Sequence, residues 1–77
     1  MNRSKIHVQY GDGSKPKGTG VTLGFTGGLG GHTKPFYTDA HGTAIVEHSS
    51  AGRADIYVSG TKRGSFNAPG ETVVFLS

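Results

Sequence analysis

Short runs in which apolar and polar residues alternate limit this chain to a narrow set of folds. In residues 53–59, for example, Ala54, Ile56 and Val58 fall on one side of an extended chain. Alternation with a period of two predicts a half-buried β-strand. No stretch shows the 3.6-residue apolar period over the length of a helix. The pattern therefore predicts an all-β protein.

Turn-forming residues separate these runs at regular intervals. Gly, Asp, Ser and Pro, which favour turns, collect in residues 11–18, 39–42, 49–52, 60–64 and 67–70. The strands expected between them are 5–10, 19–25, 36–38, 43–48, 53–59, 65–66 and 72–76. Six or seven short strands at this spacing predict a small Greek-key β-sandwich, immunoglobulin-like or prealbumin-like, in one domain over residues 1–77.

The same alternation assigns most of the core. The side chains expected to point inward are Ile6, Val8, Tyr10, Val21, Leu23, Phe25, Ala54, Ile56 and Val58. Asp55 and Tyr57 are expected to point outward. In residues 43–48 the pattern alone leaves two choices for the core face, Ala44 with Val46 or Ile45 on the opposite side.

Residues 38–42, Thr-Asp-Ala-His-Gly, predict the chain reversal about which the strands are arranged. The short Asp39 side chain can accept hydrogen bonds from backbone N–H groups close to it in sequence. Gly42 is suited to a positive φ, which other residues adopt at a cost. We therefore expect a tight reversal that leads directly into the strand at 43–48.

Glycines also gather in residues 26–35, around a single leucine. Backbone N–H groups near glycines can hold a phosphate, but this stretch lacks the Gly-Lys-Ser/Thr end of a P-loop. It also lacks a Gly-x-Gly-x-x-Gly motif, and no helix is expected after it to add a dipole. The stretch therefore predicts a mobile loop without a nucleotide site.

Composition removes several other classes of protein. The 77 residues include no cysteine, so neither disulfides nor thiolate metal sites support the fold. The net charge is +3, and the basic residues are spread along the chain and form no basic run. No apolar run has the length of a membrane span, and residues 1–5 lead into a strand and not into a signal segment. We expect no membrane association and, by default, a cytoplasmic location.

No set of catalytic or metal-binding residues is recognisable. His7, His32, His41 and His48 show none of the spacings typical of metal ligands and are expected at the surface or its rim. The carboxylate and imidazole closest in sequence are Asp39 and His41, which form the one candidate metal pair. Serine, histidine and aspartate occur without a recognisable nucleophile, base and oxyanion donor. The sequence predicts a non-enzymatic protein that uses no cofactor.

Four segments of the chain match the pattern of a known group of domains. They are residues 12–16, Asp-Gly-Ser-Lys-Pro; 18–23, Gly-Thr-Gly-Val-Thr-Leu; 37–46, with the Thr-Asp-x-x-Gly reversal; and 52–58, a Gly turn followed by a long alternating strand. In this order the chain resembles the transthyretin-like sandwich modules called carboxypeptidase regulatory-like domains and the related collagen-adhesin B-type repeats. The resemblance implies a structural or binding appendage, with Ala44 and Val46 inward and Ile45 and Tyr57 on an outer face.

We therefore expect an interaction or assembly module that binds a protein partner or itself. Exposed sheet edges and outer faces are natural docking sites for another chain. The binding residues expected on the outer face and in the Gly-rich loop are Ile45, Arg53, Tyr57, Gly28, Leu29, Gly30 and His32.

Two other functions remain open from the sequence. A carbohydrate or small ligand could bind through the loops at one end of the sandwich, with three tyrosines and no tryptophan to stack on it. A weak polyanion site could use Tyr57 with Arg53, Lys62 and Arg63. Nucleic-acid binders usually show denser basic clusters, so we do not expect a nucleic-acid partner.

Overall fold

Two β-sheets form the fold in the computed structural model, which describes residues 1–25 and 31–76. All regular structure in these residues is β-strand. The strands are β1 (Asn2–Tyr10), β2 (Gly20–Phe25), β3 (Gly31–His32), β4 (Phe36–Tyr37), β5 (Thr43–His48), β6 (Gly52–Val58), β7 (Thr61–Ala68) and β8 (Glu71–Leu76). The all-β prediction is confirmed for this part of the chain.

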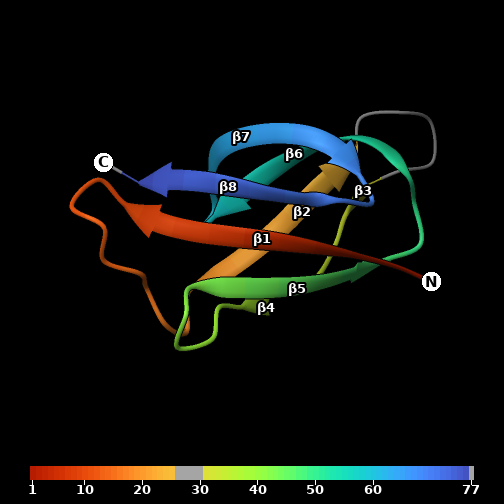
Figure 1. Cartoon of the computed structure of the whole chain (residues 1–77). Coiled ribbons are helices and arrows are strands. Elements are labelled where there is room, and N and C mark those ends of the chain that lie inside the picture. The colour runs from red at the N-terminus through yellow and green to blue at the C-terminus, as the bar shows by residue number, and fades with distance from the viewer. Residues whose placement is uncertain (26–30, 77) are drawn as a thin grey trace.

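The first sheet has the strand order β5-β1-β8, and the second has the order β3-β2-β6-β7, with β4 also paired to β2. Strand β1 is antiparallel to β5 and parallel to β8. Figure 1 shows β1 between β5 and β8, with β2 and β6 running at an angle to these three strands. The first sheet is therefore built from strands that lie far apart in sequence.

The core lies between the two sheets and follows the predicted alternation. The fully or largely buried apolar residues are Ile6, Val8, Ala44, Val46, Val74 and Leu76 from the first sheet and Val21, Leu23, Ala54, Ile56, Val58 and Ala68 from the second or its end. The inward face of β5 is the one with Ala44 and Val46, which settles the choice that the pattern left open. Tyr10 was expected inside but is 40% exposed at the end of β1, and Phe25 is only partly buried against the core.

The reversal at Asp39 forms as predicted and ties β5 to β1. The Asp39 carboxylate accepts hydrogen bonds from the backbone N–H groups of Thr43 and His41 at 3.0 and 2.8 Å. These bonds, that of Thr43 first, lower the pKa of Asp39 below its ordinary value of 3.8. Gly42 has a φ of +74°, and its carbonyl accepts a 2.7 Å hydrogen bond from the N–H of Val8.

The hairpin between β6 and β7 differs from the prediction. Its turn consists of Ser59 and Gly60, both with positive φ, as a two-residue type I′ turn requires. Lys62 and Arg63 therefore lie in β7 and not in a turn, and Arg63 is the extra residue where the register shifts beside Ile56. The turn expected at residues 60–64 and the short strand expected at 65–66 are replaced by one eight-residue strand.

The described residues contain eight strands where six or seven were expected, and the unexpected one is β3. Its two residues pair with the end of β2 inside the stretch predicted to be a mobile loop. Residues 26–30 of that stretch lie outside the described residues, so the mobile loop stays a prediction there.

Candidate functional site

On the outer face of the β5-β1-β8 sheet, strand β8 exposes two apolar side chains. The side chains of Val73 and Phe75 are 48% and 63% exposed, while their neighbours Val74 and Leu76 are buried in the core. Strand β8 is thus apolar on both faces. Single exposed apolar residues are ordinary, but two on the same face of one strand form a small apolar patch.

Strand β8 also has one unpaired backbone edge among the described residues. It pairs with β1 on one side, where the carbonyls of Gly70 and Leu76 accept hydrogen bonds from the N–H groups of Lys5 and Gly11. Backbone polar groups of successive residues point to opposite sides of a strand. Those of Glu71, Val73 and Phe75 therefore point away from β1, and no described strand pairs with them. We call this side of β8, with the side chains of Val73 and Phe75, the β8 edge.

The other two long edge strands, β7 and β5, are protected in ways that β8 is not. On β7, Lys62 and Arg63 lie beside a register shift, and charge and bulges both discourage pairing with another chain. On β5, the N–H and C=O of Thr43 are bonded to Asp39, and Glu47 adds a charge. The only charge on β8 is Glu71, at its first residue.

A polar network covers the middle of the β5-β1-β8 face. His7 on β1 contacts the Thr43 hydroxyl through Nδ1 at 2.9 Å and the Glu71 carboxylate through Nε2. The hydrogen bond with His7 lowers the pKa of Glu71 below its ordinary value of 4.5. The network links β5, β1 and β8. It does not include the apolar Val73, which lies opposite His7 on β8.

The outer face of the second sheet is polar and carries two aromatic rings. His32 on β3 and Tyr57 on β6 lie with ring centroids 5.2 Å apart over Gly24 of β2. A Cβ on Gly24 would lie 2.9 Å from His32 and 3.0 Å from Tyr57, so the glycine makes room for both rings. Cross-strand rings over a strand glycine replace the packing that it lacks.

Basic side chains on this second face are already engaged by neighbours. Arg53 donates to the Ser65 hydroxyl at 2.8 Å, and the Lys62 ammonium lies 3.4 Å from the Asp55 carboxylate. Both contacts lie between β6 and β7. Among the described residues, this face carries Arg53 and Lys62 against Asp55 and holds no dense basic cluster.

The structure therefore brings only some of the sequence-predicted binding residues together. Arg53, Tyr57 and His32 share the outer face of the second sheet. Ile45 lies on β5 of the other sheet, so Ile45 and Tyr57 do not form one outer face as we expected. Residues Gly28, Leu29 and Gly30 lie outside the described residues. Val73 and Phe75 were not predicted as binding residues, because the run Val-Val-Phe-Leu is apolar at every position and alternation cannot show which of its faces is buried.

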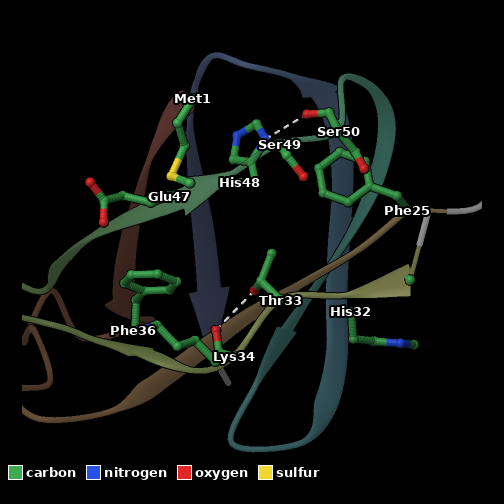
Figure 2. Close-up of a pocket in the computed structure, with 11 residues that line it drawn as sticks. Met1, Phe25, His32, Thr33, Lys34, Phe36, Glu47, His48, Ser49 and Ser50 are labelled. Atoms are coloured by element: carbon green, nitrogen blue, oxygen red, sulfur yellow. Dashed lines mark hydrogen bonds between the residues drawn. The ribbon is translucent and has the colours of Figure 1, made fainter. Parts of the chain in front are cut away.

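An open hollow of about 370 Å³ lies at one end of the sandwich, between the end of β5 and the segment that holds β3 and β4. Figure 2 shows Met1, Phe25 and Phe36 around it, while the His32 side chain points away. The Lys34 ammonium lies 5.6 Å from the centre of the Phe36 ring, whereas the Glu47 carboxylate is paired with Arg3 Nε at 3.3 Å. The hollow thus offers aromatic walls and the positive charge of Lys34.

A buried serine and histidine lie beside this hollow. The Ser4 Oγ is 2.7 Å from the His48 Nε2, and His48 Nδ1 is 2.7 Å from the Ser50 carbonyl oxygen. This is the contact that a nucleophile and its base would make. Ser4 is 1% exposed, however, and its Oγ also accepts a hydrogen bond from the Gly70 N–H. The pair instead joins β1, β5 and the turn before β8, and His48 lies inside the protein where we expected a surface position.

Within the described ranges, no three His, Cys, Asp or Glu side chains gather as a metal site. In the candidate metal pair, one oxygen of Asp39 is bonded to the backbone N–H of His41 and of Thr43. Asp39 therefore stabilises the chain reversal. No helix in the described residues is long and apolar enough to cross a membrane.

Comparisons with protein-family models, with curated proteins and with solved structures found no match to this chain.

Proposed function

We propose that this chain is a non-enzymatic interaction module that docks an extended strand of a protein along the β8 edge. The observation that carries the proposal is the coincidence on β8 of exposed apolar side chains and backbone groups with which no described strand pairs. Strand addition draws affinity from main-chain hydrogen bonds and specificity from alternate side chains. The β8 edge offers both, at Glu71, Val73 and Phe75 for the backbone and at Val73 and Phe75 for the side chains.

The contrast with the other edges supports this choice. An unprotected edge strand is a hazard for a soluble protein unless it has a partner. The same chain protects β7 by charge and a register shift, and it protects β5 by the Asp39 bonds at Thr43 and by the charge of Glu47. Strand β8 has neither device beyond its first residue, which is expected of an edge that is covered in use.

We also propose that the fold is a Greek-key sandwich of the transthyretin-like type. Its support is the strand order: β1 lies between β5 and β8, and the chain crosses to the other sheet after β1 and again after β5. Such crossings between sheets are characteristic of Greek-key sandwiches. Modules of this type serve as binding appendages, in agreement with the proposed role.

The test is photo-crosslinking in the cells that make the protein. A photo-reactive benzoylphenylalanine replaces Phe75, and the matched control replaces Tyr37. Both side chains are aromatic and similarly exposed, 63% and 64%, but Tyr37 lies on β4 of the other sheet. A discrete protein adduct from position 75 that position 37 does not give supports the proposal. Equal adducts from both positions, or none from 75, would refute it.

The hollow at the sandwich end supports a second candidate function, the binding of a small amphipathic ligand such as a sugar. Its aromatic walls are Phe25 and Phe36, whereas none of the three tyrosines lines it. Amide NMR spectra recorded with a panel of mono- and disaccharides test this candidate. Saturable shifts confined to Thr33, Lys34 and Ser49 would support it, and an unchanged spectrum at millimolar sugar would remove it.

A further inference from the structure

We infer that the strand docked on the β8 edge is β8 of a second copy of this chain, antiparallel and centred on Val74. The inference rests on the proposed docking function of the β8 edge and adds the identity of its occupant and the register. The two copies would join their β5-β1-β8 sheets into one continuous six-stranded sheet.

The backbone of β8 fits an antiparallel copy of itself. A two-fold axis perpendicular to the sheet keeps outer faces with outer faces, so odd residues of one copy lie opposite odd residues of the other. The odd residues are those whose N–H and C=O point to the free side. In an antiparallel ladder, two such residues placed opposite each other exchange both hydrogen bonds.

The side chains select the register. When the axis passes through Val74, Val73 of each copy lies opposite Phe75 of the other, and Val74 lies opposite its own copy. When it passes through Val73, Glu71 lies opposite Phe75. Aromatic and β-branched residues stabilise each other when directly opposite, whereas a carboxylate gains nothing from a phenyl ring. The Val74-centred register therefore pairs the two most exposed apolar side chains of β8.

The inner face agrees with this register. Val74 already packs in the core beside Val8, its partner on β1. Pairing Val74 with Val74 of the second copy extends this apolar row across the junction. On the same face Thr72 lies opposite Leu76, again without a charge at the junction.

The assembly would close at two copies. Each copy contributes the same edge, so the interface is isologous and consumes both β8 edges. The strands left at the ends of the joined sheet are the two copies of β5, whose Thr43 is bonded to Asp39. A dimer, and not an open fibre, is therefore the expected product.

Sedimentation velocity of the purified chain over a concentration series tests the dimer. The wild type is expected to shift from monomer to dimer, and Phe75→Lys to raise the dissociation constant at least about tenfold, because lysine on an edge strand opposes pairing and symmetry places two in each dimer. Tyr37→Lys is the matched control and is expected to leave association unchanged. Val73→Lys is the second variant, and thermal melts of all variants check the fold.

Cysteine cross-linking tests the register, since the chain has no cysteine of its own. Residues directly opposite have Cα atoms about 5.5 Å apart, within disulfide range, whereas a two-residue offset places them about 8–9 Å apart and outside it. The Val74-centred register predicts that Val73→Cys and Phe75→Cys proteins cross-link when mixed but not separately. Cross-linking of Val73→Cys alone would overturn this register.

The outcomes separate this inference from the function on which it rests. A wild type that stays monomeric at millimolar concentration, or a Phe75→Lys dimer as tight as the wild type, would overturn self-pairing at the β8 edge. In the first case, an adduct between position 75 and a different protein in cells would keep the docking function and replace its occupant. The absence of any adduct would remove both.

Discussion

Substitution of Gly42 by alanine tests the reversal on which the arrangement of strands depends. The φ of Gly42 is +74°, a conformation that costs a residue with a side chain about 1–2 kcal/mol. A Cβ at this position would also lie 2.6 Å from the carbonyl oxygen of Val8 and 2.9 Å from Lys15 Cβ. The Lys15 side chain can move, but the Val8 backbone is tied to Gly42 by a 2.7 Å hydrogen bond. Overpacking of this kind costs about 1–3 kcal/mol.

Gly18 provides a control with nearly the same backbone. Its φ is +72°, and a Cβ there would meet nothing within 4 Å. In both variants the stiffer unfolded chain returns about 0.4–1 kcal/mol. We expect Gly42→Ala to lower the free energy of unfolding by about 2–4 kcal/mol and Gly18→Ala by about 1 kcal/mol or less. Urea denaturation followed by circular dichroism measures both. Equal losses would show that the close approach to Val8 is not what requires glycine at position 42.

Three further predictions concern the core, the buried polar pair and the reversal. Ile56→Ala removes a fully buried side chain from β6 and is expected to cost about 2–4 kcal/mol in urea denaturation; a loss under about 0.5 kcal/mol would place it outside the core. Ser4→Ala leaves His48 without its buried partner and is expected to lower the free energy of unfolding by about 1–3 kcal/mol. His48→Phe is expected to lower it less in the Ser4→Ala protein than in the wild type, because the contact between the two residues is already lost. The lowered pKa of Asp39 means that its ionised form stabilises the fold fully above the ordinary pKa of 3.8 and that this contribution is lost as the pH falls through the lower folded value. Melting temperatures of wild type and Asp39→Asn, measured from pH 6 down to 2, should therefore fall more steeply for the wild type, and parallel curves would contradict this.

The parts of the fold that the sequence predicted are those where side-chain parity or turn chemistry has one solution. In β6, Ala54, Ile56 and Val58 alternate with polar residues, so only one face can be buried. At the reversal, Asp39 and Gly42 each supply a local property, a carboxylate acceptor and a tolerated positive φ, that acts within a few residues. Both features are decided by short-range physics, and the structure confirms both.

The features that the sequence did not predict depend on long-range pairing. The turn was expected at residues 60–64, because Lys62 and Arg63 lie between two glycines. In the structure the turn is Ser59 and Gly60, and Lys62 and Arg63 belong to β7, which pairs with β6. The contact of Ser4 with His48 joins residues 44 positions apart. Ile45 and Tyr57 both point outward, but nothing local shows that β5 and β6 belong to different sheets. In each case the missing information is which strands are neighbours.

The same reasoning explains why the candidate site lies on β8. A 77-residue chain can build only a small core, since domains of this size bury only about 60–65% of the surface that the unfolded chain exposes. A strand with Val74 and Leu76 inside would be most soluble with polar residues at the alternate positions, yet Val73 and Phe75 stand there. Their side chains are 48% and 63% exposed in the single chain, so they contribute little to its core. A partner strand along β8 would bury both side chains and would pair with the backbone groups of Glu71, Val73 and Phe75 at the same time. This is the physical reason to look for the function of this chain at the β8 edge.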